Sequence, residues 1–287
     1  MERIQVAIEK ARKSRDGSQE PKTVNMREKT KPSEKRAAPE TVTSDESALD
    51  ALWKEVPSLQ PDAKRLHRNR ILAYRSCPEA APYDMMRTKL VQQLRKNDWR
   101  RVAITSDAAG SGKTMTALNL AFSLARQSDL RIMVVDLDMR RPSMVRILGI
   151  QKHVQFSEAL EERDPPEEHL IRYGRNLVFA LNSGSARHSA ELLQGITASR
   201  VLDDLEARYA PDVMIFDTPP LSSSDDTLAF LDQIDCALLL VEAEKTRASD
   251  VDKCEQELAA RTNVIGVVLN KCRYLERSEA YGYYGAT

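Results

Sequence analysis

The sequence has 287 residues, and its 43 Lys and Arg residues are balanced by 43 Asp and Glu residues, so the formal net charge at pH 7 is zero. A chain without net charge has no overall field that attracts nucleic acid or a membrane surface, and we expect no nucleic-acid partner. No apolar run approaches the ~20 residues that span a bilayer, and the N-terminus lacks the apolar segment of a secretory signal. These features predict a cytosolic protein.

The four cysteines and four histidines are not spaced as metal ligands. The cysteines form no CxxC pair, and the histidines are scattered along the chain. Cys236 lies inside an apolar run, which is typical of a buried thiol. We therefore interpret the cysteines as reduced thiols and expect neither a disulfide framework nor a zinc site.

The N-terminal part of the chain differs in composition from the rest. Apolar residues at helical spacing predict a short amphipathic helix over 2–15, which is either docked or ordered only on a partner. Residues 16–46 are mainly polar and charged, which predicts a disordered linker. A second short helical anchor is expected over 49–56. The basic run 64–70 is interpreted as a solvated linker, with contact to anionic lipid or nucleic acid as the alternative.

Residues 101–142 organise the rest of the chain. A β-branched run over 102–105 predicts a buried strand, and a loop of small residues and a helical pattern follow it. Glycines let backbone N–H groups approach a phosphate, and the N-terminus of the helix adds the positive end of its dipole. This order predicts a phosphate cradle, although Asp107 stands where the standard pattern has glycine. The residues expected to contact the nucleotide are Gly110, Ser111, Gly112, Lys113, Thr114 and Met115.

Five further apolar runs have the character of buried strands. Helical stretches over 201–209 and 251–260 separate some of them, and strands that alternate with helices predict a parallel sheet covered by helices on both faces. Ligands of such sheets bind at the carboxyl ends of the strands. An irregular insertion over 153–172 predicts no chemistry of its own. The five expected strands are 131–135, 177–181, 213–216, 236–241 and 264–269.

Three carboxylates stand at the ends of two of these strands. Asp136 and Asp138 follow one strand, and the alternation of strand side chains predicts that they point the same way. Asp217 ends another strand. A nucleotide-bound Mg²⁺ needs oxygen ligands and acceptors for its waters, so we expect Thr114 as a direct ligand and Asp138 and Asp217 as acceptors. Asp136 then remains as the base for an incoming nucleophile.

Two motifs and a tyrosine-rich C-terminus resemble the bacterial tyrosine kinases of exopolysaccharide synthesis. The motifs are DLDMRRP at 136–142 and DTPP at 217–220, and the resemblance covers residues 83–287. These kinases are P-loop proteins related to the septum-positioning and plasmid-partitioning ATPases. The partitioning relatives have a signature lysine at the position of Ala108, so alanine there favours the kinase branch.

The resemblance also implies roles for single residues. Lys113 and Arg140 would offset charge on the transferring phosphoryl group, and Asp136 would accept the tyrosine proton. Asn270 matches the asparagine that contacts adenine in the family. Asp226 matches an acidic position shortly after the DTPP motif.

Three tyrosines near the C-terminus are the expected phosphorylation sites. In the resembling family such tyrosines are autophosphorylated in trans, when the tail of one molecule enters the site of another. Glycines flank them here and make the segment mobile. An aromatic terminus without a role is the alternative. The three sites are Tyr281, Tyr283 and Tyr284.

One motif of the family is altered in this chain. Family members carry a Glu-x-x-Arg-x-x-Arg helix before the first strand, which joins subunits into a ring. The aligned residues here are Ala81, Asp84 and Arg87, so only the last matches. We therefore expect the isolated chain to be mainly monomeric or weakly associated, with assembly dependent on a partner.

We expect the chain to consist of an N-terminal segment of short helices and disordered linker (1–80), a P-loop kinase domain (81–272) and a flexible tail (273–287). Three functional hypotheses follow. The first is a protein tyrosine autokinase that uses ATP and Mg²⁺ and regulates polysaccharide polymerisation and export. It would act at the inner face of the cell membrane through a membrane-embedded polysaccharide co-polymerase as activator. The second is a partitioning or positioning ATPase switch without a protein substrate, and the third is an ATP-binding scaffold without transfer activity.

Overall fold

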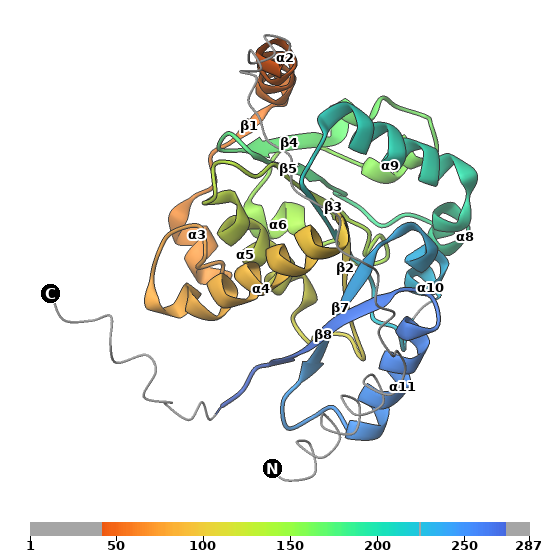
Figure 1. The fold of residues 1–287 in the computed structure, drawn as a ribbon. Coiled ribbons are helices and arrows are strands. Elements are labelled where there is room, and N and C mark those ends of the chain that lie inside the picture. Colours follow the sequence, from red (N-terminus) through yellow and green to blue (C-terminus); the bar gives the residue numbers. More distant parts are fainter. Residues whose placement is uncertain (1–41, 224, 274–287) are drawn as a thin grey trace, which may run out of the picture. The chain divides into compact units, whose positions relative to one another are not determined.

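An eight-stranded sheet forms the centre of the computed structural model, which describes residues 42–223 and 225–273 (Figure 1). Its strand order is β1-β4-β5-β3-β6-β2-β7-β8. The predicted helix over 2–15 and the three tail tyrosines lie outside the described residues. The strands are β1 Ser58–Leu59, β2 Arg101–Ser106, β3 Ile132–Asp136, β4 Leu170–Tyr173, β5 Leu177–Ala180, β6 Val213–Asp217, β7 Cys236–Glu242 and β8 Asn263–Asn270.

The six strands expected from the sequence are all present, and the predicted fold class is confirmed. All neighbouring strands pair in parallel except β4 and β5, which are antiparallel, so the sheet is mostly rather than wholly parallel. β4 and β5 are antiparallel because a short turn at Gly174 joins them, whereas a parallel pair needs a long crossover. β4 arises from the end of the insertion over 153–172.

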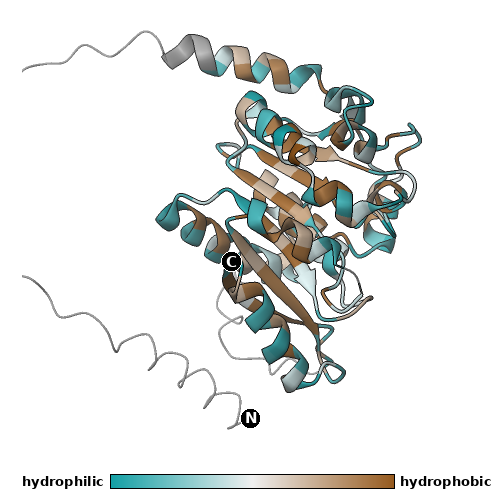
Figure 2. Ribbon diagram, turned by 90° about the vertical axis from the view of Figure 1, so that its right-hand side faces the viewer, coloured by the Kyte–Doolittle hydropathy of each residue, from teal (hydrophilic) through white to brown (hydrophobic). Residues whose placement is uncertain are grey.

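Helices cover both faces of the sheet, and Figure 2 shows apolar strands between helices with hydrophilic outer surfaces. One face is covered by α3 Ala63–Arg68, α4 Ala81–Asn97, α5 Lys113–Ala125 and α6 Met144–Leu148. The other is covered by α2 Val42–Glu55, α7 Phe156–Leu160, α8 Ser189–Gln194, α9 Ile196–Tyr209, α10 Asp226–Phe230 and α11 Ala248–Ala259. Short 3₁₀ turns occupy Pro78–Ala80, Pro166–His169 and Leu231–Gln233. None of the helices in the described ranges is long and apolar enough to cross a membrane.

The compact part of the chain begins earlier than the expected boundary at residue 81. Residues from Val42 onward belong to one compact unit with the rest of the described chain. Trp53 of α2 is 1% exposed, donates its indole N–H to the carbonyl of Tyr209 at 2.8 Å and packs edge-on against that ring. This contact confirms the predicted anchor over 49–56. Periodicity predicted this helix but not its contact with α9, because that contact joins residues 156 positions apart in the sequence.

The basic run over 64–70 is not a solvated linker. Its residues form α3 and the turn that follows, and Leu66 is buried in the core beneath them. Asn119 of α5 binds the segment that follows α3. Its side-chain oxygen accepts from the backbone N–H groups of Leu72 and Ala73, and its amide group donates to the carbonyl of Arg70.

Replacing Asn119 with alanine is expected to destabilise the protein strongly. The substitution leaves two backbone N–H groups and one carbonyl without partners, and each such buried group costs about 1–3 kcal/mol. Because water can reach part of the turn, we expect the free energy of unfolding to fall by about 2–4 kcal/mol, measured by urea denaturation. Asn97→Ala is the matched control, since Asn97 is exposed and bonds only within its own helix. Equal losses in the two variants would contradict this account.

The altered ring motif is engaged within the chain. The carboxylate of Asp84 on α4 accepts from Arg126 at 2.8 and 3.0 Å and from the hydroxyl of Ser123 at 2.5 Å. Arg87 donates to the carbonyl of Ser123 at 3.1 Å. These side chains join α4 to α5, so they serve packing inside the described chain.

Candidate functional site

The phosphate loop leaves the sheet at the end of β2 and returns into α5. Gly110 and Gly112 have φ angles of 85° and 99°, a left-handed backbone that glycine adopts without strain. A Cβ atom at Gly112 would lie 2.3 Å from the side-chain nitrogen of Asn270, so the position also needs glycine for space. Lys113 is the first residue of α5, which places the loop's backbone at the N-terminal end of that helix.

Side chains inside the loop hold its shape. The hydroxyl of buried Ser111 donates to the carbonyl of Ala108 and to the carboxylate of Asp107. The other oxygen of Asp107 accepts from Thr246 in the loop after β7, at 2.9 Å. Aspartate in place of the usual first glycine therefore ties the phosphate loop to a neighbouring strand end.

Asn270 lies beside the loop at the end of β8. Its side-chain amide donates to the carbonyl of Ser111 at 2.8 Å. The predicted adenine contact is thus a residue that supports the phosphate loop in this structure. Its contact with a base remains a prediction.

Asp136 and Asp217 end adjacent strands and stand opposite each other in the register of the sheet. Both are fully buried. One oxygen of Asp217 accepts from the Thr114 hydroxyl at 2.5 Å, whereas the other has no hydrogen-bond partner among the described residues. The oxygens of Asp136 form no well-aligned hydrogen bond with a described donor. The backbone N–H groups of Asp138 and Met144 are nevertheless close enough to lower the pKa of Asp136.

Burial raises the pKa of each of the three carboxyl groups. For Asp136, burial and the nearby Asp217 and Asp138 charges raise the pKa well above its usual range. For Asp217, burial raises the pKa to about 7, while Lys113 and the Thr114 hydroxyl act in the opposite direction. For Asp138, burial raises the pKa and Lys113 again opposes the change.

Asp138 lies differently from Asp136, contrary to the expectation that the two point the same way. β3 ends at Asp136, so strand alternation no longer applies two residues later. Asp138 is half-buried and lines the cavity in front of the phosphate loop, whereas Asp136 lies beneath the cavity wall. The two carboxylates are therefore available for different contacts.

Arg140 also lines this cavity, and it is bound to two carboxylates. Its guanidinium donates to both oxygens of buried Asp226 at 2.9–3.2 Å and lies 3.5 Å from Asp225. Ser189 donates to the same Asp226 carboxylate at 2.7 Å. Asp226, the acidic residue shortly after the DTPP motif, thus fixes Arg140 at the edge of the cavity.

One cavity of about 550 Å³ brings most of the predicted residues together. Gly110, Gly112, Lys113, Thr114 and Met115 line one side of it. Lys113 is 5% exposed and has no ion-pair partner among the described residues. Arg141, Pro219 and Pro220 of the two quoted motifs also line the cavity. The sequence pattern did not indicate the part of the lining that the end of α3, the region of α6 and the turn after β6 contribute. These additional residues are Asn69, Ser143, Arg146, Ile147 and Ser223.

The residues present fit a nucleotide phosphate with a divalent cation. The buried carboxyl groups of Asp136 and Asp217 stand opposite each other, and one Asp217 oxygen accepts from Thr114 while the other has no hydrogen-bond partner among the described residues. A buried carboxylate charge is costly unless a cation compensates it. An unpaired lysine and two left-handed glycines stand beside them, as a phosphate requires. Thr114, Asp136 and Asp217 would hold Mg²⁺ directly or through its waters, and the cation would offset charge on the phosphates.

The acidic pair gives the ligand-free protein a predictable pH dependence. Folded Asp217 keeps its proton up to about pH 7, whereas an unfolded aspartate loses it near pH 4. The folded state therefore binds more protons in this window, and its stability falls as pH rises through it. We expect the stability of Asp217→Asn relative to the wild type to increase by about 1.4 kcal/mol per pH unit between pH 4 and 7. Urea denaturation at several pH values measures this, and parallel curves for the two proteins would contradict it.

A second group of potential metal ligands lies away from this cavity. Ligand atoms of Glu158, Asp164 and His169 all lie within 4.8 Å of one another. The Nδ1 atom of His169 accepts from the backbone N–H of Gln155 at 2.9 Å, so a neutral ring carries its proton on Nε2. That proton faces Asp164 at 3.6 Å and occupies the lone pair that a metal would need. The arrangement favours a structural role.

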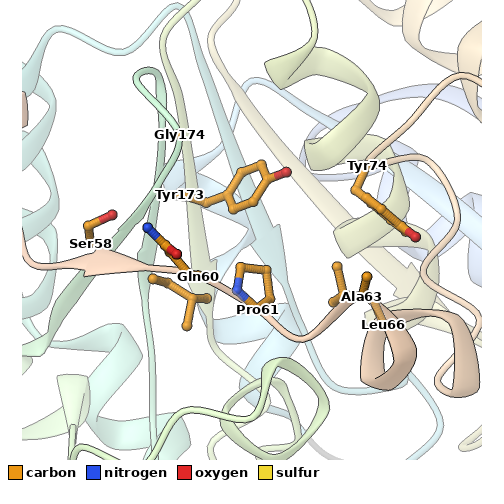
Figure 3. Close-up of a pocket in the computed structure, with 9 residues that line it drawn as sticks. Ser58, Gln60, Pro61, Ala63, Leu66, Tyr74, Tyr173 and Gly174 are labelled. Atoms are coloured by element: carbon orange, nitrogen blue, oxygen red, sulfur yellow. The ribbon is translucent and has the colours of Figure 1, made fainter.

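A second cavity, of about 440 Å³, lies between β1, α3 and the end of β4 (Figure 3). Tyr173 and Tyr74 approach it from different segments, and the ring of Tyr173 packs edge-on against Phe122. Its other lining residues include Pro61 and Leu66 and no charged group. None of the predicted site residues lies there.

Comparison with known proteins assigns the chain to a family. A model of the ParA family, described as NUBPL iron-transfer P-loop NTPase, matches residues 99–281, which is well over half of the chain. The chain belongs to the ParA family of P-loop NTPases. Its phosphate loop is therefore that of a P-loop NTPase.

The relatives of this ParA-family chain include bacterial tyrosine kinases, as the sequence motifs predicted. Tyrosine-protein kinase YwqD from Bacillus subtilis (strain 168) is 29% identical over 207 residues, which are 71% of this chain and 85% of the relative. The chimerical protein CapA2B2 has a TM-score of 0.64 at 22% identity, covering 79% of this chain and 99% of that one. The kinase domain of the Escherichia coli tyrosine kinase ETK has a TM-score of 0.61 at 20% identity, covering 77% and 92%.

Proposed function

We propose that this chain is an ATP- and Mg²⁺-dependent protein tyrosine kinase that phosphorylates its own C-terminal tyrosines and regulates exopolysaccharide polymerisation and export. The observation that carries the proposal is the cavity that joins the phosphate loop to a half-buried carboxylate and an arginine-lined rim. A cavity of this size holds a nucleotide phosphate end and a tyrosine side chain together. The kinship with tyrosine kinases supports the same reaction.

Phosphoryl transfer requires positioning and charge stabilisation more than covalent chemistry from the protein. Lys113 and the loop backbone at Gly110, Ser111 and Gly112 would hold the phosphates, and Met115 would line the same side. Arg140, whose Nε and Nη2 groups donate to Asp226, would present its Nη1 group to the transferring group. Mg²⁺ would be held near Thr114 and Asp217 and would offset phosphate charge.

The base that accepts the tyrosine proton is assigned to Asp138 rather than to Asp136. A general base must reach the proton it removes, and Asp138 lines the cavity while Asp136 has no exposed surface. Burial raises the pKa of Asp138 and so brings it closer to the pKa of the tyrosine hydroxyl that Asp138 would deprotonate. Asp136 is assigned to the acidic pair beside Thr114.

A membrane-embedded polysaccharide co-polymerase is the proposed activator, and it would bring the kinase to the inner face of the cell membrane. Other protein tyrosines would be further substrates. Self-association would follow from activator binding, because Asp84 and Arg87 of the altered ring motif are engaged within the chain.

Removing the three acceptor hydroxyls tests the proposed reaction. Tyr281, Tyr283 and Tyr284 replaced together by phenylalanine keep the aromatic bulk and lose only the acceptor oxygens. We expect the phosphotyrosine content, measured by mass spectrometry after incubation with activator and Mg²⁺–ATP, to fall nearly to zero. Nucleotide affinity should be unchanged. Tyr74→Phe is the control, because that tyrosine lines the other cavity and should not be an acceptor.

The partitioning or positioning ATPase remains the second candidate, because the ParA family model itself matches the chain. Ala108 and the terminal tyrosines favour the kinase. ATP hydrolysis without any phosphotyrosine in the wild-type protein, with its activator present, would replace the kinase assignment by the switch.

A further inference from the structure

The rim of the cavity formed by Arg141 and Arg146 has no role in the reaction described so far. We propose that these two arginines bind a carboxylate next to the target tyrosine, so that the enzyme selects tyrosines preceded by acidic residues. The inference rests on the proposed kinase function and names the class of peptide that its site accepts.

The rim arginines form no ion pair that a ligand would have to break. Both side chains are exposed and line the nucleotide cavity, and neither forms an ion pair with any residue in 42–223 or 225–273, although the charge of Arg141 opposes the rise in the pKa of Asp138. Arg140 beside them differs, since it forms an ion pair with Asp226. Two unpaired guanidinium groups at the mouth of one cavity make a local positive field on a chain without net charge.

The strand order places the rim on the substrate side of the phosphate loop. β2, which leads into the loop, has β7 and β8 on one side and β6 and β3 on the other. Asn270, the expected adenine contact, ends β8, whereas Arg141 and Arg146 follow β3. A nucleotide that extends from the loop toward β8 leaves the rim to the second substrate.

The rim is also fixed in place before a ligand binds. Arg65 of α3 donates to the carbonyl of Arg146 at 3.2 Å, and Asn69 donates to the carbonyl of Ile147 at 3.1 Å. Gly149, with a φ of 78°, lets the Arg65 side chain pass where a Cβ would lie 2.7 Å from it. The backbone that carries Arg146 is therefore held before a peptide binds, and only the exposed arginine side chains have to be ordered.

The tail of this chain has the corresponding chemistry in its sequence. Glu279 stands two positions before Tyr281, and Glu276 stands five positions before it. In an extended peptide a carboxylate two positions away lies about 7 Å along the chain from the acceptor tyrosine and one five positions away about 17 Å, so Glu279 is the nearer candidate for the rim.

A peptide-binding experiment tests the inference without requiring the activator. A fluorescent peptide of residues 276–287 and a second peptide with Gln in place of both glutamates are titrated onto the full chain with Mg²⁺–ADP, and anisotropy gives the Kd. We expect the glutamate peptide to bind about ten-fold more tightly. Arg141→Gln and Arg146→Gln should each weaken it about three- to five-fold, and together about ten-fold, with no effect on the glutamine peptide.

Controls separate this proposal from its alternatives. Arg95→Gln changes an exposed arginine on α4, away from the rim, and should leave both peptide affinities unchanged. Arg146→Glu should reverse the preference toward a peptide with Lys in place of the glutamates. Equal binding of the two peptides would overturn the inference, and so would a matching loss of Mg²⁺–ADP affinity in the arginine variants. Selective binding without phosphotransfer, in the presence of the activator, would instead refute the kinase function.

Discussion

Replacing Lys113 with alanine is expected to abolish nucleotide binding, with a loss of at least about 100-fold in affinity, and to abolish phosphotransfer with it. The ammonium group is nearly buried at the first position of α5 and has no ion-pair partner among the described residues, so its charge is available to a phosphate. The same charge lowers the pKa values of Asp138 and Asp217, and its removal will favour their protonated forms. Isothermal titration with Mg²⁺–ATP measures the first effect.

The fold should survive this substitution, because the apolar cores on both faces of the sheet do not depend on Lys113. Circular dichroism and urea denaturation check this point. Lys89→Ala is the matched control, since that lysine is exposed on α4 away from the cavity. A folded Lys113→Ala protein that binds Mg²⁺–ATP with wild-type affinity would show that the loop is not the nucleotide site.

Asparagine substitutions at Asp136 and Asp138 are expected to have different effects. Asp138→Asn should lower the rate of phosphotransfer by about 10²–10⁴-fold and change nucleotide affinity little, because it removes only the proton acceptor at the cavity wall. Asp136→Asn removes a buried charge beside Thr114 and Asp217 and should make nucleotide binding much less dependent on Mg²⁺. Single-turnover phosphotransfer and binding with and without Mg²⁺ separate the two effects.

The two variants also decide between the alternative assignments of the base. If Asp138→Asn keeps wild-type transfer while Asp136→Asn loses it with normal Mg²⁺–nucleotide binding, the base is Asp136. That outcome would require the buried carboxylate to become accessible when substrates bind. The ranking of Asp138 above Asp136 depends on burial, which differs completely between two residues that the strand pattern treats alike.

The central strands, the phosphate loop and the three carboxylates near it could be predicted from the residue pattern. These features depend on local signals: continuous apolar runs for buried parallel strands, glycines at left-handed positions, and polar residues where a strand ends. Because parallel strands share one carboxyl edge, the order of elements alone was enough to bring Lys113, Thr114 and Asp217 together.

The rest of the site depends on contacts between residues that are distant in the sequence. Trp53 and Asn119 hold the segment from α2 to Ala73 through contacts with residues 46–156 positions away, and no local pattern reports such contacts. The full burial of Asp136 and the partial burial of Asp138 follow from where β3 ends against its neighbours. The rim of Arg141 and Arg146 likewise depends on α3 packing against α6, because residues distant in sequence become neighbours only when the core is assembled.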